Sequence, residues 1–232
     1  MVKRLSHRFG VNSTFFFNRI LIYFLSIFFF SRVFYVISKW DSFKYIESYM
    51  DFFLMTDYNF SLFGAIFGFL LVLFVTVIVN GLRSGKYIDV GVLAFLFTSF
   101  FGYIGAFLGG QIYGKQTNFG IEILYNTQFS NVGYQVPIFP LPIVYSLIFI
   151  ILFAFLYIIS IFINIRGIIG YFGLILFSTI ILIFEKFNGE TDYFLISYGV
   201  NFNQIMSIFL IILSFVGLFR IYKTPVKKDI IN

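Results

Sequence analysis

Residues 60–80 read FSLFGAIFGFLLVLFVTVIVN, and this stretch decides the fold because it contains no charged side chain. About 20 helical residues cross the hydrocarbon core of a bilayer, so an uncharged run of this length is typical of a membrane span. Similar runs recur along the chain. The sequence therefore predicts an all-α, polytopic membrane helix bundle with six transmembrane helices, near 15–38, 60–80, 88–108, 143–165, 167–184 and 202–220.

The composition agrees with a membrane protein and excludes several kinds of chemistry. Of the 232 residues, 60% are hydrophobic and only 11% are charged. A soluble domain carries about twice that fraction of charge. Cysteine is absent and His7 is the one histidine, so we expect no disulfide, no metal site, no cofactor and no hydrolase triad. The basic residues flank apolar runs, which is typical of membrane topology signals and not of nucleic-acid binding.

The distribution of Lys and Arg predicts the orientation, because cytoplasmic segments carry an excess of these residues. If the N-terminus is inside, four of the 16 Lys and Arg residues fall in outside loops. Arg32 lies within a span, and the others lie inside. We therefore predict a multi-pass protein of the bacterial cytoplasmic membrane with both termini cytoplasmic. The inside set is Lys3, Arg4, Arg8, Arg19, Arg83, Lys86, Arg166, Arg220, Lys223, Lys227 and Lys228, against Lys39, Lys44, Lys115 and Lys186 outside.

We expect a single integral membrane domain over residues 1–232, with basic cytoplasmic tails at 1–14 and 221–232. The longest loop, around 109–142, would be extracytoplasmic. Within it, residues 117–123 are typical of a short strand, and Pro137, Pro140 and Pro142 favour an extended approach to the fourth span.

A glycine-rich stretch, 101-FGYIGAFLGGQIYGKQTNFG-120, ends the third span. From Phe101 to Gly114 it contains no acid, base, histidine or cysteine. Glycines let a second helix or a lipid approach the backbone closely. We therefore predict a lipid-binding set formed by Arg32, Gly102, Gly105, Gly109, Gly110 and Gly114.

Several stretches together resemble the prolipoprotein diacylglyceryl transferases, bacterial inner-membrane enzymes that move a diacylglyceryl group from phosphatidylglycerol to a lipoprotein cysteine. The family signature G-R-x-G-N-F-x-N-G-E appears as residues 102–111, followed by Gly114. The family's S-F-H-G-G appears as 61–65, H-P-x-Q-L-Y-E as 139–145, and G-Q-x-x-S-I as 203–208. The resemblance runs from about Leu21 to the end of the chain.

The frame of these motifs is kept, whereas most of the reactive residues are replaced. Tyr103 and Ile181 stand where the family has arginines, and Phe63 stands where it has histidine. The remaining replacements are Ala106 and Gly109 for asparagines, Gln111 for the signature glutamate and Asn188 for a later arginine; Glu185, Arg32 and Tyr35 match family residues. The resemblance also implies a missing first span, because family members have seven spans and this chain begins where their second does.

We therefore hypothesise a membrane-embedded pseudoenzyme that binds phospholipid and acts as a structural or docking subunit, with other membrane proteins or lipoproteins as partners. The alternative is an active, divergent transferase whose rebuilt site contains Arg32, Tyr103, Gln111 and Glu185. Arg32 would contact a lipid phosphate or a partner acid, or it would extend to the outer interface. Glu185 would pair with Arg32, or it would be a solvated residue neutralised by Lys186.

Overall fold

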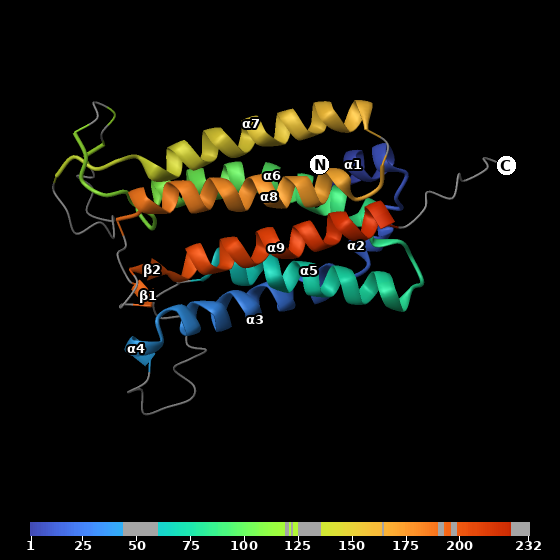
Figure 1. Ribbon diagram of the computed structural model, residues 1–232, viewed down its shortest axis with the longest axis horizontal. Helices are drawn as coiled ribbons and strands as arrows, with labels where there is room; N and C mark the ends of the chain where they lie inside the picture. The colour runs from blue at the N-terminus through green and yellow to red at the C-terminus, as the bar shows by residue number, and fades with distance from the viewer. Residues whose placement is uncertain are drawn as a thin grey trace.

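The computed structural model describes residues 1–43, 60–118, 121, 123–124, 136–163, 165–189, 193–195 and 199–223. Within them, six long apolar helices lie side by side and alternate in direction (Figure 1). The predicted membrane helix bundle with six spans is thereby confirmed, and the protein is a multi-pass membrane protein. The six are α3 (Ile20–Ser38), α5 (Leu62–Val79), α6 (Ser84–Leu108), α7 (Leu141–Phe162), α8 (Ile168–Phe184) and α9 (Phe202–Lys223).

The first span begins one turn later than predicted, because the chain breaks its helix at Arg19. The short helix α2 (Thr14–Phe17) precedes the break, and Arg19 has non-helical backbone angles of φ −118° and ψ 15°. Its guanidinium donates to the Phe15 carbonyl and to Asn80 Oδ1, each at 3.2 Å. The cation is thus held between α2 and the end of α5, outside the apolar helix.

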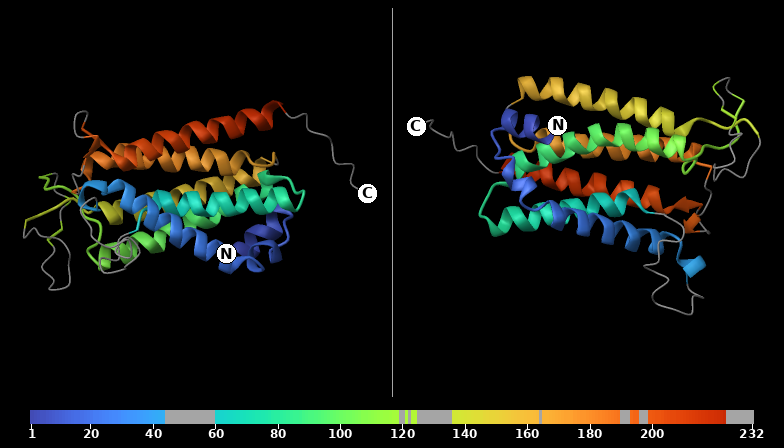
Figure 2. Two further views of the ribbon diagram at one scale, coloured as in Figure 1. Left: turned by 90° about the horizontal axis from the view of Figure 1, so that it is seen from below. Right: turned by 180° about the vertical axis from the view of Figure 1, so that it is seen from behind.

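The segment predicted as a basic tail contains a helix, α1 (Val2–Phe9), which packs against the start of α6 (Figure 2). Leu5 and Ser6 are fully buried, whereas Lys3 and Arg4 are exposed. The helix is amphipathic, and its polar face is strongly basic. It is too short and too charged to be found by a search for membrane spans.

The spans pack chiefly as three pairs, α3 with α5, α6 with α7 and α8 with α9, and α8 also packs on α6. Glycines set the first pair. A Cβ on Gly68 would lie 2.6 Å from the Ser26 carbonyl oxygen, and the Ser26 hydroxyl donates to the Gly68 carbonyl at 3.0 Å. Small residues four apart, here Gly64 and Gly68, are a usual means of close packing between membrane helices.

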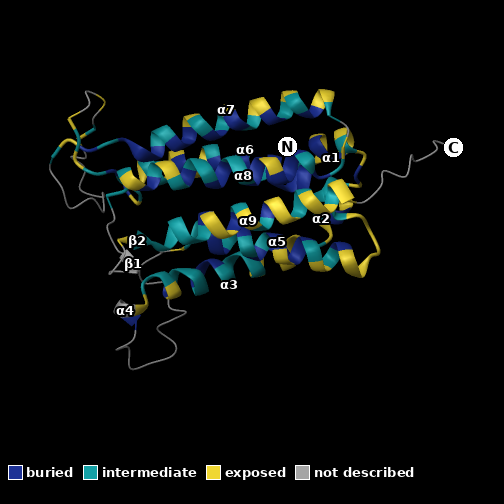
Figure 3. Ribbon diagram, in the orientation of Figure 1, coloured by how far each residue is buried: buried dark blue, intermediate teal, exposed yellow. Residues whose placement is uncertain are grey.

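The burial pattern is that of a bundle in lipid, with apolar side chains on the outer faces of the helices as well as inside (Figure 3). The centre contains large side chains such as Phe149, Phe177 and Leu96. Several buried serines donate to carbonyls of their own helices, as Ser207 and Ser214 do at 2.7 Å. Such local bonds satisfy a hydroxyl where water is absent.

Short elements connect the spans at one end of the bundle. They are α4 (Trp40–Phe43), a 3-10 helix (Glu185–Phe187), and strands β1 (Tyr193–Leu195) and β2 (Val200–Asn201), which pair antiparallel. The strand predicted at 117–123 lies partly outside the described residues. Around it, Gln116 and Ile123 each form a single bridge to Ile138.

The two ends of the bundle differ in character, and we name them for that difference. The basic end holds α1, the turns after α5 and α7, and the end of α9, so the N-terminus and the end of the last span lie on this side (Figure 1). The described members of the predicted cytoplasmic set belong to segments at this end. The opposite end, the pocket end, holds the connections after α3, α6 and α8.

Candidate lipid-binding pocket

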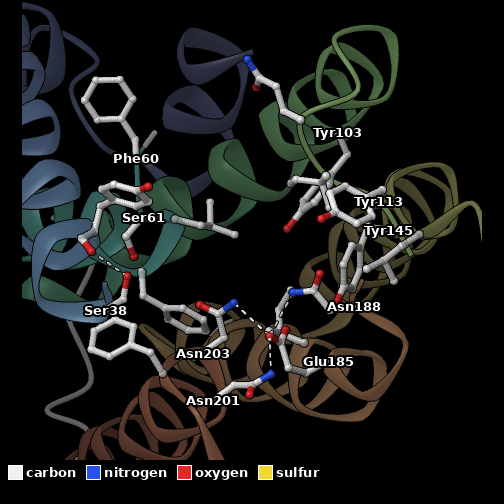
Figure 4. Close-up of a pocket in the computed structure, with 18 of the residues that line it drawn as sticks. Ser38, Phe60, Ser61, Tyr103, Tyr113, Tyr145, Glu185, Asn188, Asn201 and Asn203 are labelled. Atoms are coloured by element: carbon white, nitrogen blue, oxygen red, sulfur yellow. Dashed lines mark hydrogen bonds between the residues drawn. The ribbon is translucent and has the colours of Figure 1, made fainter. Parts of the chain in front are cut away.

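A cavity of about 320 Å³ opens at the pocket end, where six spans or their ends meet (Figure 4). Its lining comes from the end of α3, the start of α5, the last turns of α6 and α8, and the starts of α7 and α9. No two neighbouring elements could form it alone. The cavity therefore depends on the whole bundle.

The stretches that carry the family resemblance converge on this cavity. The signature supplies Tyr103 and Gln111, and the segment 139–145 supplies Leu141 and Tyr145. The stretch 61–65 supplies Ser61 and Phe63, and the stretch 203–208 supplies Asn203. The other matched positions on the lining are Tyr35, Ile181, Glu185 and Asn188. Segments far apart in sequence thus place their matched positions around one space.

Local structure explains how the signature reaches the cavity. Gly110 adopts φ 59°, a left-handed conformation suited to glycine, and Gln111 N–H donates to the Ala106 carbonyl at 3.1 Å. The chain then pairs with the segment after α8, where Lys115 N–H donates to the Phe187 carbonyl at 2.9 Å. Gly114 in this pairing leaves no room for a Cβ against Phe139. The turn and the bridge together bring Gln111 and Tyr113 to the lining.

Glu185 is the buried carboxylate of the pocket, with only 4% of its surface exposed. Its Oε1 accepts hydrogen bonds from Asn188 Nδ2 and Asn203 Nδ2, both at 3.1 Å, and from Asn201 Nδ2 at 3.4 Å (Figure 4). Hydrogen bonds to an ionised acceptor are stronger than neutral ones. The carboxylate therefore ties the end of α8 to β2 and the start of α9.

Glu185 fits neither of its two expected environments. It is buried rather than solvated, and the contacts that engage its carboxylate come from asparagines. Arg32 is buried as well, but its guanidinium lies over the rings of Tyr35 and Phe43, at 5.4 and 5.7 Å from their centroids. Among the described residues that line the pocket, Tyr35 is present and Arg32 is not.

Aromatic rings form one side of the pocket, where Figure 4 shows Tyr103, Tyr113 and Tyr145 gathered. The Tyr103 and Tyr145 rings are 5.0 Å apart, and both contact Phe149, at 5.4 and 5.7 Å. Tyr103 and Tyr145 are almost fully buried. This side therefore offers ring surface and phenolic hydroxyls.

The predicted lipid-binding glycines do not form one surface. Gly102 and Gly105 lie on an exposed face of α6, and a Cβ on either would have no neighbour within 4 Å. Gly110 makes the turn and Gly114 packs tightly, while Gly109 lies beside Gln111. The described pocket lining includes none of these five glycines and no Arg32.

Of the residues predicted for a rebuilt catalytic site, the structure brings Tyr103, Gln111 and Glu185 to one pocket. Sequence reasoning missed the three asparagines around Glu185 and the cation Lys39 on the lining. Asn203 begins a matched family motif that does not point to Glu185, and Asn201 belongs to a strand pair that no pattern predicted. The described residues contain no group of three metal-binding side chains.

A comparison with protein-family models finds the model described as prolipoprotein diacylglyceryl transferase, which matches residues 1–220. The match begins at α1 and extends through nearly all of α9. It therefore reaches further towards the N-terminus than the resemblance noted from Leu21. A comparison with curated proteins finds no match.

Proposed function

This chain belongs to the prolipoprotein diacylglyceryl transferase family, and from that premise we propose that it binds a membrane phospholipid without transferring its diacylglyceryl group. It would act as a structural or docking subunit of a complex in the bacterial cytoplasmic membrane. Its termini would be cytoplasmic, and the pocket would face the outer side, because the basic end carries the predicted inside charges.

The chemistry of the pocket lining carries this proposal. Diacylglyceryl transfer needs cations that hold the phosphodiester and a group that takes the proton of the acceptor thiol. On the described lining the charged side chains are Lys39 and Glu185, and three amides already donate to Glu185. Four lining positions matched to a histidine and to arginines of the family hold Phe63, Tyr103, Ile181 and Asn188, and the retained Arg32 is not on the described lining.

The same lining supports binding of a lipid headgroup. Lys39 supplies one positive charge for a phosphodiester, and Gln111 and the tyrosine hydroxyls supply hydrogen-bond donors. Glycerol hydroxyls and phosphate oxygens are acceptors for such donors. The phenylalanine and tyrosine rings of the same lining suit the apolar part of the lipid.

Native mass spectrometry of the purified protein with added phosphatidylglycerol tests the binding. We expect Lys39→Gln combined with Gln111→Leu to reduce the retained lipid at least threefold, since each change removes polar contact worth about 1 kcal/mol. The control is Ser38→Ala. Ser38 lines the same pocket, but its hydroxyl donates to the Tyr35 carbonyl of its own helix at 2.7 Å. Equal lipid retention by the double variant and wild type would contradict the proposal.

One observation favours an active, divergent transferase instead: Tyr103, Gln111 and Glu185 share one pocket. In that alternative Glu185 would take the thiol proton and Tyr103 would donate to the departing phosphate. A strain depleted of its own transferase separates the two functions. We expect this gene not to restore lipoprotein lipidation; restoration that Glu185→Gln abolishes would establish the alternative.

The docking role is supported by the exposed face of α6, where Gly102 and Gly105 leave the backbone open to a neighbouring helix. Purification in mild detergent followed by mass spectrometry of co-isolated proteins tests this role. We expect Gly105→Leu to lose the partner, whereas Ile104→Leu, an exposed volume-conserving change on the same turn, keeps it. Recovery of wild-type protein as a lone monomer would contradict docking.

A further inference from the structure

A second polar cavity, of about 430 Å³, lies at the basic end and shares no lining residue with the pocket described above. Four segments meet around it: the end of α1, the start of α6, the last turns of α7 and the turn before α8. Its charged lining residues are Arg8, Lys86, Arg166 and Asp89. Among the described residues, three cations therefore face one acid.

Asp89 is engaged elsewhere, which leaves the cations to determine what the cavity attracts. Its carboxylate is 1% exposed and accepts from Gly167 N–H at 2.7 Å and Gly170 N–H at 2.6 Å. These are donors at the start of α8, where a carboxylate is favoured by the unpaired N–H groups and the helix dipole. Asp89 thus serves as the cap of α8.

Contacts place two of the cations, Arg8 and Lys86, beside the cavity. Arg8 Nε donates to Ser160 Oγ at 3.1 Å, and its guanidinium lies over the Tyr157 ring at 5.3 Å. The Lys86 ammonium lies beside Gly10, 3.5 Å from where a Cβ would stand. Arg166 and Lys86 are partly buried, whereas Arg8 is exposed. Partly buried charges are screened less by salt than exposed ones, so Lys86 and Arg166 supply the better-protected charge.

Part of the cavity lining is apolar, because Phe9, Ile163 and Ile165 also line it. The cavity lies at the ends of membrane-spanning helices, beside the amphipathic helix α1. A cationic pocket between transmembrane helices, near the membrane surface, suits the headgroup of an anionic lipid. The chemistry that fits is a phosphate-bearing anion with an apolar portion that contacts the apolar part of the lining.

We propose that the cavity lined by Arg8, Lys86 and Arg166 is a binding site for a phosphate-bearing anion, supplied by the headgroup of an anionic phospholipid. The site is independent of the pocket around Glu185. It would bind α1 to the bundle through the ligand, since Arg8 comes from α1 and the other cations come from α6 and the turn before α8.

Binding of dihexanoyl phosphatidic acid to the detergent-purified full chain tests this site, with dihexanoyl phosphatidylcholine as the zwitterionic comparator. The triple variant Arg8→Gln, Lys86→Gln, Arg166→Gln is expected to bind the anionic lipid on the order of a hundredfold more weakly, because each cation near a membrane surface contributes about 1 kcal/mol. The matched triple Lys3→Gln, Arg4→Gln, Lys223→Gln removes equal charge from exposed positions and should stay within about twofold of wild type.

Further arms keep the test decisive. Should the triple variant not fold, Lys86→Gln alone is expected to cost roughly fivefold in affinity, and Arg8→Lys should bind like wild type. If inorganic phosphate displaces the lipid, the site recognises the phosphate group alone. If it does not, the site requires the whole lipid headgroup with its apolar part. Equal binding by the two triple variants, or equal affinity for both lipids, would overturn the proposal.

Discussion

At the scale of single residues, Glu185 is the side chain whose surroundings decide how the pocket is interpreted. The sequence indicates that this acid is retained at a family position. It does not reveal that Asn188, Asn201 and Asn203 donate to it, because these residues come from three separate elements. Only the folded chain brings them together, so the sequence predicts the acid but not its environment.

Removing the Glu185 carboxylate should destabilise the pocket end. Glu185→Ala leaves three partly buried amides without their acceptor, and we expect a loss of about 1–3 kcal/mol in the free energy of unfolding. Ser38→Ala, on the same pocket, should cost less than about 1 kcal/mol. Unfolding in detergent, followed by circular dichroism, measures both. A Glu185→Ala variant as stable as Ser38→Ala would contradict the structural role of the carboxylate.

Asp89 shows a second limit of sequence reasoning. Its place near the start of the third span predicts an interaction with the dipole of its own helix, whereas its carboxylate caps α8 instead. We expect Asp89→Asn to cost about 2 kcal/mol, because an amide has only one oxygen for the two N–H donors. The control in the same unfolding measurement is Thr98→Ala, which removes an exposed hydroxyl of the same helix. If the two substitutions lower the free energy of unfolding equally, Asp89 does not cap α8.

At the scale of elements, the length of each hydrophobic run predicts the membrane spans well, but it does not predict helix α1 or the strand pair β1–β2. The six apolar helices are found because their composition alone requires the bilayer. Helix α1 is missed because its stability comes from packing Leu5 against α6, which no local pattern reveals. The pair β1–β2 is missed for a similar reason, since such short strands depend on their tertiary setting.

Two kinds of glycine in the helices should respond differently to alanine. Gly68→Ala forces α5 away from α3, where a Cβ would meet the Ser26 carbonyl, and should cost about 1–3 kcal/mol. Gly102→Ala adds a methyl group to open space and should change the stability by less than about 1 kcal/mol. Melting midpoints of the two variants in one detergent provide the comparison. A destabilised Gly102→Ala would mean that its face is covered in the isolated protein.

At the scale of the whole molecule, the predicted orientation can be tested by labelling residues at the basic end and at the pocket end of the bundle. The chain contains no cysteine, so single cysteines can be labelled without a background. We expect Lys115→Cys to react with an impermeant maleimide in intact cells, and Lys3→Cys and Lys223→Cys to react only after permeabilisation. The reverse pattern would place the pocket on the cytoplasmic side and contradict the charge argument.

The whole bundle also explains which part of the site could be foreseen. The resemblance identified the stretches that surround the pocket, because a common fold brings corresponding positions together. It could not predict that the rings of Tyr103 and Tyr145 would pack together, tilted by 45°, on one side of the pocket. Nor could it predict that Arg32 would lie over Tyr35 and Phe43 rather than on the described lining. Such details depend on how replaced side chains repack.

The most direct test of the central claim is transfer itself, measured with purified protein in phosphatidylglycerol liposomes and a cysteine-containing lipobox peptide. Mass spectrometry of the peptide detects the added diacylglyceryl group, and an active family member serves as the positive control. We predict no modified peptide above the protein-free blank, although the protein retains phosphatidylglycerol. Modified peptide that disappears with Glu185→Gln would contradict the account and show that the pocket is catalytic.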